Sequence, residues 1–432
     1  DSATGINGAT GASNVTNVLD GDTLDGSPVT PSLVNISVVT PATPANAGAP
    51  VPTLDTATGQ VSVPAGTPAG SYTIRYEICE KLNPTNCSTN TVTVEVAASP
   101  IVAANDSATG INGMAGATAV VNAFTADTVN GAAASTANAV LSVAPTSTVP
   151  AQLTFDPATG NVDVKPGTPA GTYSFDYQIC EKLNPSNCKT ATISVTVVAA
   201  AISADPDSVT GVNGATGATN VTNVLDGDTL DGSPVTPLLV DIKVVTPATP
   251  ASAGAPVPVL DITTGQVNVP AGTPAGNYTI RYEICDKLNP TNCASNQITV
   301  AVVASPILAS DDSVQDINGL AGATAVVNAF TGDTVNGAAA APSNTILSVA
   351  AGHTVPPELS FDPATGDIDV NPGTPAGTYS FRYELCEKLN PSNCTAAMIS
   401  VKVIAAEILA DEDTVSGING ATGADDVLSV LD

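Results

Sequence analysis

The residues with the most reactive side chains are eight cysteines, which occur as four pairs with one spacing. Seven residues separate the members of each pair, and the pairs are Cys79 and Cys87, Cys180 and Cys188, Cys285 and Cys293, and Cys386 and Cys394. Structural zinc sites use gaps of about two to four residues and need further Cys or His ligands. No histidine accompanies any pair, which disfavours a catalytic thiol as well. The spacing therefore predicts four disulfides and an oxidising, extracytoplasmic location.

Aspartates are the second set of residues that could do chemistry, because calcium prefers several oxygen ligands converging from a short turn. One cluster repeats the sequence Asp-Gly-Asp-Thr-Leu-Asp, and the other recurs at the start of each repeated segment. The candidate calcium ligands are Asp20, Asp22, Asp25, Asp106, Asp207, Asp226, Asp228, Asp231 and Asp312. The downstream glutamate of an EF-hand loop is missing. A solvated acidic surface that keeps the protein soluble is the alternative. Calcium is the one cofactor considered, and none is required.

The charge balance excludes several classes of function. Lys and Arg together number 11 against 40 Asp and Glu, which gives a net charge of −29. Nucleic acids and anionic membranes both attract basic surfaces, so we expect neither as a partner. A single histidine, His353, leaves little general acid–base chemistry near neutral pH, and we do not expect an enzyme. No apolar run approaches the ~20 residues of a membrane span.

The composition is that of a folded chain. Hydrophobic residues make up 43% of the sequence and charged residues 12%, so the protein can bury cores and is not a disordered polyelectrolyte. The chain begins at Asp1 without an initiator methionine, which predicts a fragment of something longer.

Internal repetition is the dominant feature of the sequence. The opening segment Asp1-Ser-Ala-Thr-Gly-Ile-Asn-Gly returns at steps of 105, 101, 105 and 101 residues. Odd units resemble odd units more than even ones, so the full period is a pair of units. The predicted units are two of an odd type, 1–104 and 206–310, two of an even type, 105–205 and 311–411, and the start of a fifth, 412–432.

Each unit shows the alternation of strands. Tyr72, Ile74, Tyr76 and Ile78 alternate with more polar residues, and a second alternating run at 92–96 follows a polar turn, which predicts a hairpin. The segment 54–63 predicts another hairpin, and runs near 15–19 and 33–39 supply further strands. About seven short strands in ~100 residues predict an all-β fold of immunoglobulin-like sandwiches, four in tandem, forming an extended stalk.

The units also indicate their own cores. All six Phe residues lie in even units, and odd units place Leu or Ile at the matching positions. Interior positions tolerate such an exchange of one apolar side chain for another when their neighbours repack. A Tyr that follows a Gly before the first Cys resembles a tyrosine corner. The Gly-rich openings of the units do not start a helix, so we do not expect them to bind phosphate.

The motifs together resemble one family. Val-Leu-Asp-Gly-Asp-Thr-Leu-Asp-Gly-Ser-Pro-Val-Thr-Pro and Tyr-Glu-Ile-Cys-Glu-Lys-Leu-Asn-Pro-Thr-Asn-Cys are similar to the tandem repeats of giant cell-surface adhesins of gliding Bacteroidota, the SprB-like gliding motility adhesins. The resemblance covers all four complete units. It implies export by the type IX secretion system, a place on the cell surface, and contact with the gliding machinery.

The family resemblance also suggests a modification, since surface proteins of Bacteroidota are O-glycosylated where Asp precedes Ser or Thr and an apolar residue. Local turn hydrogen bonds made by Asp-Ser and Asp-Thr pairs are the alternative. The candidate acceptors are Ser2, Thr23, Thr56, Ser107, Thr128, Ser208, Thr229, Ser313, Thr334 and Thr414.

Two classes of function follow from these observations. The first is a structural stalk of a secreted adhesin, whose partners are neighbouring repeats, the secretion or gliding machinery and extracellular surfaces. The second is a binding module, repeated along the chain, for polysaccharide or a protein. Carbohydrate sites usually expose aromatic rings, whereas the Phe and Tyr residues here fall at predicted core positions, which favours the stalk.

Overall fold

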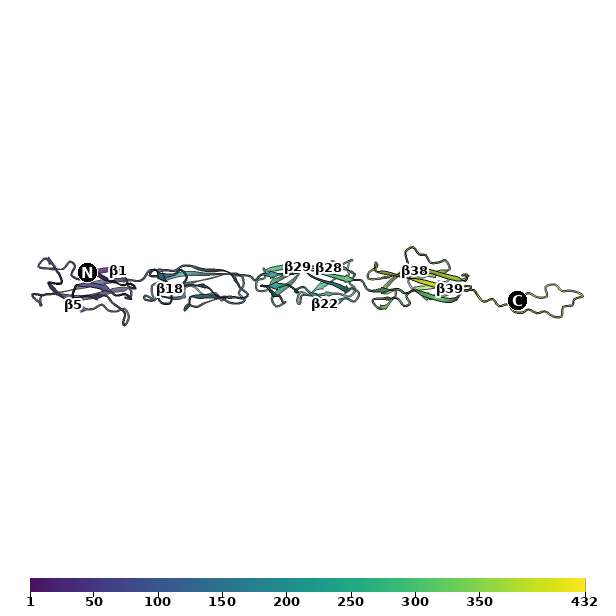
Figure 1. Ribbon diagram of the computed structural model, residues 1–432, viewed down its shortest axis with the longest axis horizontal. Coiled ribbons are helices and arrows are strands. Elements are labelled where there is room, and N and C mark those ends of the chain that lie inside the picture. The colour runs from purple at the N-terminus through teal and green to yellow at the C-terminus, as the bar shows by residue number, and fades with distance from the viewer. Residues whose placement is uncertain (432) are drawn as a thin grey trace. The chain divides into compact units, whose positions relative to one another are not determined.

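The structure, a computed structural model, describes residues 1–431 and contains β-strands as its only regular elements in that range. Figure 1 accordingly draws arrows and loops without a coiled ribbon. Within the same residues, no helix is long and apolar enough to cross a membrane. The predicted all-β fold is confirmed: one set of sandwich strands recurs four times along the chain.

Repeats 1 and 2 are defined here by their strands. Repeat 1 contains β1 (Ser2–Asn7), β2 (Ala12–Asn17), β3 (Thr23–Leu24), β4 (Ser27–Pro28), β5 (Val34–Thr40), β6 (Thr53–Leu54), β7 (Gln60–Val63), β8 (Gly70–Glu80) and β9 (Cys87–Ala97). Repeat 2 contains β10 (Ile101–Val102), β11 (Asp106–Asn112), β12 (Ala117–Asn122), β13 (Thr128–Val129), β14 (Ala132–Ala133), β15 (Ala139–Val143), β16 (Leu153–Phe155), β17 (Asn161–Val164), β18 (Gly171–Glu181) and β19 (Cys188–Val198).

Repeats 3 and 4 follow the same order. Repeat 3 contains β20 (Ile202–Ser203), β21 (Asp207–Asn213), β22 (Ala218–Asn223), β23 (Thr229–Leu230), β24 (Ser233–Pro234), β25 (Val240–Thr246), β26 (Val259–Leu260), β27 (Gln266–Val269), β28 (Gly276–Asp286) and β29 (Cys293–Val303). Repeat 4 contains β30 (Ile307–Leu308), β31 (Asp312–Asn318), β32 (Ala323–Asn328), β33 (Thr334–Val335), β34 (Ala338–Ala339), β35 (Thr345–Val349), β36 (Leu359–Phe361), β37 (Asp367–Val370), β38 (Gly377–Glu387) and β39 (Cys394–Ile404).

The chain divides into two compact units. The first consists of Asp1–Ile202 with Leu230–Gly232 and Asp286–Asn292, so it holds repeats 1 and 2, and the second takes the other residues. Residues 405–431 form coil and turns without a strand, and Asp432, the last residue of the predicted fifth unit 412–432, lies outside the described residues. The predicted bounds of the individual units stay predictions.

Two sheets face each other in each repeat. In repeat 1 one sheet has the order β1-β9-β8-β5 and the other the order β2-β7-β6. The pairing of β1 with β9 is parallel, whereas β8 pairs antiparallel with both β9 and β5. Figure 1 shows the equivalent long strands of the later repeats, β28 with β29 and β38 with β39, lying side by side.

The core lies between the two sheets, on the face where the alternation placed it. Tyr72 is opposite Val94 and Ile74 is opposite Val92, and all four side chains are buried. In repeat 2 the rings of Phe155 and Phe175 pack with centroids 5.4 Å apart. The Phe residues of even repeats and the Leu and Ile residues of odd repeats thus fill equivalent core positions, as the sequence predicted.

Two close contacts involve the loop that precedes β8. Tyr72 donates a hydrogen bond from Oη to the carbonyl of Pro68, at 2.8 Å, and the equivalent tyrosine of every repeat does the same, as a tyrosine corner should. Gly8 lies so close to the carbonyl of Thr67 that a Cβ would clash with it. Close backbone packing therefore accounts for this glycine of the Gly-rich opening.

Candidate functional site

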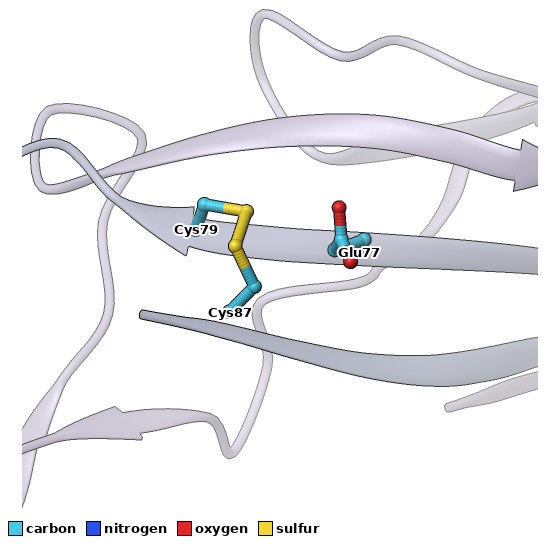
Figure 2. Close-up of side chains that lie close together, drawn as sticks. All are labelled: Glu77, Cys79 and Cys87. Carbon is cyan, nitrogen blue, oxygen red and sulfur yellow. A yellow bond between two sulfur atoms is a disulfide. The ribbon is translucent and has the colours of Figure 1, made fainter. Parts of the chain in front are cut away.

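The cysteine stretch forms the tip of the longest hairpin in each repeat. Cys79 on β8 lies opposite Cys87 on β9, and the two are joined by a disulfide, with a Cα–Cα distance of 4.1 Å. Figure 2 shows this bridge across neighbouring strands, with Glu77 on the same strand as Cys79. All four predicted disulfides are present. The Glu–Cys–Cys groups are therefore no metal sites, since both sulfurs are bonded to each other.

The glutamate after the first cysteine is the least expected feature of the hairpin. Glu181 is only 2% exposed although it carries a carboxylate. Its two oxygens accept hydrogen bonds from Ser99, which lies in the segment leading from repeat 1 into repeat 2. The Ser99 backbone N–H donates to Oε2 at 3.0 Å, and the Ser99 hydroxyl donates to Oε1 at 2.6 Å.

Two asparagines of the hairpin complete this arrangement. Asn184 and Asn187 each donate from Nδ2 to Glu181 Oε2, at 2.8 and 2.9 Å. Asn187 Nδ2 also donates to the carbonyl of Ser99 at 2.8 Å, so every polar atom of that serine has a partner. We call Glu181, Asn184, Asn187 and the segment that they hold the junction clamp.

Further contacts join the same two repeats. Asn184 Oδ1 accepts a hydrogen bond from the Ala69 N–H of repeat 1 at 2.6 Å. Asn7 of repeat 1 donates from Nδ2 to Asn130 Oδ1 of repeat 2, also at 2.6 Å. A pocket of about 520 Å³ lies beside the clamp, lined in part by Ala9 and Gly66 of repeat 1. Several hydrogen bonds therefore connect the two repeats.

The second compact unit contains an equivalent clamp. Glu387 accepts from the Ser305 N–H at 3.1 Å and from the Ser305 hydroxyl at 2.7 Å. Asn390 and Asn393 donate to Glu387 Oε2, each at 2.9 Å, and Asn393 also donates to the Ser305 carbonyl. The clamp is thus a built feature that recurs with the full period of the sequence.

The hydrogen bonds also decide the charge state of the clamp. Burial by itself would raise the pKa of Glu181, but the donors Ser99, Asn184 and Asn187 outweigh it and leave the pKa below its usual value. The same holds for the pKa of Glu387. Both glutamates are therefore ionised at neutral pH, and their bonds are charge-assisted.

The Asp-Gly-Asp-Thr-Leu-Asp stretch forms a hairpin. Asp25 and Gly26 both have positive φ, 49° and 77°, and they connect β3 to β4 as a two-residue turn of the type that favours Asp-Gly. Asp231 with Gly232 repeats this conformation. Among the predicted calcium ligands, the side chains of Asp20, Asp25, Asp226 and Asp231 are exposed.

The remaining candidate ligands lie around a buried tyrosine. In repeat 2, Tyr177 donates from Oη to Asp127 Oδ2 at 2.9 Å, and the Ala104 carbonyl lies at the same distance. Asp127 Oδ1 accepts from the Ala104 N–H. Asp106 is 7% exposed, and its Oδ2 is buried without a hydrogen bond. We call Asp106, Asp127 and Tyr177 the aspartate–tyrosine cluster.

Burial perturbs the carboxyls of this cluster. It raises the pKa of Asp106 to about 6; the Tyr177 hydroxyl opposes the shift, and the charge of Asp127 adds to it. Burial also raises the pKa of Asp127. These directions are opposite to that of Glu181, because Asp106 has few donors to compensate the loss of water.

Equivalent clusters recur in the other repeats. Tyr76 donates to Asp1 Oδ2 at 2.9 Å, and burial raises the pKa of the half-buried Asp22. The equivalents in repeats 3 and 4 are the three-residue sets Asp207, Asp228 and Tyr282, and Asp312, Asp333 and Tyr383. Burial raises the pKa values of Asp207, Asp228 and Asp312 to about 6.

In repeat 3 the structure brings together one aspartate from each predicted cluster, Asp207 and Asp228. The clusters of repeats 1, 2 and 4 each include an aspartate that was not among the predicted ligands, namely Asp1, Asp127 and Asp333. Within residues 1–431, the only groups of three possible ligand residues with atoms close together are those at the disulfides. Calcium binding at the aspartates stays a prediction. Each aspartate–tyrosine cluster would offer the ion two carboxylates.

The predicted glycosylation acceptors differ in exposure. The side chains of Ser2, Thr23, Thr56, Ser107, Ser208, Ser313 and Thr414 are exposed, whereas those of Thr128, Thr229 and Thr334 are half-buried. Thr56 lies in a turn that Asp55 stabilises by accepting from the Ala57 N–H and the Thr58 hydroxyl, so turn bonding there does not use the Thr56 side chain. Glycosylation stays a prediction.

The sequence-based prediction missed the clamp. The signal was present, because Glu or Asp, two asparagines and a Pro recur around each cysteine pair. A disulfide hairpin requires none of these polar residues, so their recurrence could have indicated a contact with something outside the hairpin. Which segment they bind could not be read from the hairpin itself.

Comparisons with known proteins find likeness at the level of fold. No model of a protein family matches the chain, and no curated protein matches it. Among solved structures, protocadherin gamma B2 extracellular cadherin domains 3–6 are 11% identical, with a TM-score of 0.28, covering 94% of this chain and 98% of that one. The human desmocollin-1 ectodomain is 9% identical, with a TM-score of 0.30, covering 98% and 83%. Mouse cadherin-23 EC22–24 is 13% identical, with a TM-score of 0.28, covering 70% and 95%.

Proposed function

We propose that this chain is the structural repeat region of a large secreted cell-surface adhesin, which displays an adhesive region away from the cell. The observation that carries the proposal is the junction clamp. A repeat region that only tethered an adhesive domain would need no buried carboxylate dedicated to the linker between two repeats.

The linker itself supports a stiff connection. β9 ends at Ala97 and β10 begins at Ile101, so three residues separate the strands of one repeat from those of the next. One of the three is Pro100, whose φ is restricted by its ring, and another is the clamped Ser99. Little conformational freedom therefore remains in this segment.

The chemistry of the surface fits an extracellular stalk. Four disulfides suit an oxidising compartment. All Phe and Tyr side chains are buried or half-buried, which favours a structural role over a repeated carbohydrate site. Secretion through the type IX system and a role in gliding are the finer form of this proposal, and they rest on the motif resemblance.

Small-angle X-ray scattering of the chain, with and without clamp substitutions, tests the stalk. Strands rise ~3.3 Å per residue, so each repeat should extend roughly 40 Å and four repeats roughly 160 Å. Replacing both clamp glutamates, Glu181→Ala with Glu387→Ala, should shorten the mean particle and broaden its distance distribution. The matched control replaces Glu77 and Glu384, which lie on the same kind of strand outside the clamp, and should leave the rod unchanged.

A compact particle for the unmodified chain would overturn the stalk, because the repeats would then fold onto one another. Equal scattering from the clamp variant and the unmodified chain would show that the clamp does not control the junctions.

A further inference from the structure

The linkers and the hairpins that hold them differ in one pair of residues. The cysteine hairpins of repeats 2, 3 and 4 share the sequence Lys-Leu-Asn-Pro, then Ser or Thr, then Asn-Cys. The acid in front of this sequence varies between Glu and Asp, and one linker residue varies between Ser and Ala. The two vary together, and the pairs are Ser99 with Glu181, Ala200 with Asp286, and Ser305 with Glu387.

In the clamps that contain glutamate, the acid bonds to the linker through both of its oxygens. Glu181 Oε1 accepts from the Ser99 hydroxyl at 2.6 Å, and Glu387 Oε1 accepts from the Ser305 hydroxyl at 2.7 Å. The Oε2 atoms accept from the backbone N–H groups of the same serines. The hydroxyl of the linker is therefore part of the hydration that the buried carboxylate regains.

Asp286 obtains donors from its own hairpin. Its side chain is 1% exposed. Its Oδ1 accepts from the Leu288 N–H and its Oδ2 from Asn289 Nδ2, both at 2.8 Å. An aspartate is one methylene shorter than a glutamate, so its carboxylate stays closer to the hairpin backbone. Both of its oxygens therefore have partners without a hydroxyl from the linker.

The backbone of the linker is held in the same way in both kinds of clamp. Ala200 belongs to the same compact unit as the hairpin residues Asp286–Asn292. Asn292 Nδ2 donates to the Ala200 carbonyl at 2.8 Å, as the matching asparagines of the glutamate clamps do to their serines. The Asp231 N–H donates to the Ala201 carbonyl at 2.7 Å. The acid and the linker side chain, more than the backbone contacts, distinguish the two kinds of clamp.

We propose that the acid and the linker residue form a matched pair, which specifies the linker that each hairpin binds. A hairpin with glutamate accepts a linker with serine, and a hairpin with aspartate accepts a linker with alanine. Alanine beside glutamate would leave a buried carboxylate oxygen without its donor. Serine at Ala200, which is 3% exposed, would bury a hydroxyl beside an acid whose oxygens are already occupied.

Such a pair is useful because the repeats are otherwise very similar. A linker could dock on the wrong hairpin of its own chain, or on a second copy of the chain, and repeat proteins misassemble in this manner. A mismatch that costs free energy excludes the wrong partner. The inference rests on the clamp of the proposed function and names the residues that select its partner.

A double-mutant cycle in the full chain tests the matched pair. The readout is hydrogen exchange at the Asn130 amide, which donates to the Pro100 carbonyl of the linker at 2.8 Å. Ser99→Ala and Glu181→Asp should each speed this exchange about tenfold, since each removes a hydrogen bond to a buried charge. The double variant has the pair found in repeat 3. Its exchange should therefore be much slower than the product of the single effects, which would be about a hundredfold increase.

The reverse exchange tests the same pair in the other direction. Asp286→Glu should speed exchange at the Asp231 amide, because the longer acid finds no hydroxyl on Ala200. Adding Ala200→Ser should restore most of the protection. This second cycle adds a hydroxyl where the first one removes it, so general damage to the chain cannot produce the same result in both.

The matched control combines Glu181→Asp with Ser305→Ala, two changes that lie in different clamps. Exchange at Asn130 should then equal that of Glu181→Asp alone, and exchange at Asn336 should equal that of Ser305→Ala alone, because no pair is restored. Effects that simply multiply in either cycle would overturn the matched pair. So would a rescue of Glu181→Asp by Ser305→Ala.

These outcomes are separate from those that decide the stalk. The scattering experiment removes both clamp carboxylates, whereas the cycles exchange one acid for the other. A shortened particle together with multiplying exchange effects would keep the stalk and reject the matched pair. Coupled exchange effects together with unchanged scattering would keep the matched pair and reject the control of the junctions by the clamp.

Discussion

Glu181 and Glu387 are carboxylates that have almost no contact with water, which costs free energy unless hydrogen bonds replace the lost hydration. Ser99 donates two of those bonds to Glu181, and the Ser99 carbonyl accepts a separate hydrogen bond from Asn187. A substitution that removes the Ser99 hydroxyl therefore tests how much the clamp contributes to the association of the two repeats.

We predict that Ser99→Ala destabilises the junction by about 1–3 kcal/mol, because one buried carboxylate oxygen loses its donor. The control is Ser88→Ala, which removes an exposed hydroxyl from β9. Hydrogen exchange at the Ser99 and Asn130 amides measures the result. Equal exchange in both variants would show that the serine hydroxyl is dispensable.

The buried aspartates predict a dependence on pH with a defined sign. The pKa values of Asp106, Asp207, Asp228 and Asp312 are raised to about 6 in the folded chain, above the ordinary value near 3.8. The folded state then binds more protons than the unfolded state between about pH 4 and pH 6. Stability from these groups is complete below pH 4 and is lost as the pH rises through 6.

The clamp glutamates act in the opposite direction. Their lowered pKa values contribute stability above the ordinary value of 4.5, and this contribution disappears as the pH falls. The two groups of acids together should therefore give the chain its highest stability in mildly acidic solution.

Asp106→Asn isolates the aspartate contribution. The amide resembles the protonated carboxyl in shape and cannot ionise, so we expect a higher melting temperature at pH 7.5 and little change at pH 4.5. The gain should be on the order of 1–3 kcal/mol, the free energy equivalent of a shift of about two pKa units at most. Asp163→Asn, on the central strand β17 of the other sheet and outside the cluster, is the control. Stabilisation of equal size at both pH values would contradict a buried ionisation.

At the scale of elements, the hairpin of β18 and β19 has two roles. Its disulfide closes a short loop, and the same loop presents Glu181, Asn184 and Asn187 to the linker. Because the sulfurs hold the two strands together directly beside the clamp, the covalent bond restricts the loop in the conformation that binds Ser99.

Two double substitutions separate these roles. Cys180→Ser with Cys188→Ser should cost about 2.5 kcal/mol from loop entropy and should also speed exchange at the Ser99 amide. Cys79→Ser with Cys87→Ser should cost a similar amount in repeat 1 without affecting Ser99, because Ser99 bonds to the β18–β19 hairpin instead. Thermal melts and hydrogen exchange provide the two readouts. Faster Ser99 exchange in both variants would show that the disulfides act only on general stability.

At the scale of the whole molecule, the excess of acidic residues predicts a response to cations. The chain carries a net charge of −29, so nonspecific ions will stabilise it to some extent by screening alone. A specific calcium site should act at low concentration and through the aspartate–tyrosine clusters.

We predict that 1 mM calcium raises the melting temperature at pH 7.5 relative to EDTA, and by more than the same ionic strength of sodium chloride does. Asp106→Asn with Asp127→Asn should remove the part of the effect that belongs to repeat 2. Scattering from the same samples reports whether calcium changes the mean length of the particle. Equal melting in calcium, EDTA and salt would assign the aspartates to the solvated acidic surface.

Much of the fold could be predicted from the sequence, because its signals are local. The alternation of Tyr72, Ile74 and Tyr76 defines which face of a strand is buried, and the even repeats mark the same core by exchanging aliphatic residues for Phe. Cysteines eight positions apart on a hairpin lie opposite each other once the strands pair. Each of these inferences needs only neighbours in the chain or a comparison of one repeat with another.

The tertiary structure alone decided the sites. Ser99 and Glu181 are separated by 82 positions, and Tyr177 and Asp127 by 50, so no spacing in the sequence relates them. Their pairing depends on where one repeat ends against the next and on which loop covers the buried tyrosine. The sequence by itself determined a chain of disulfide-bonded β-sandwiches. Only the packed structure determined which acids are ionised at a junction and which are desolvated in a core, because water is excluded by residues from distant segments.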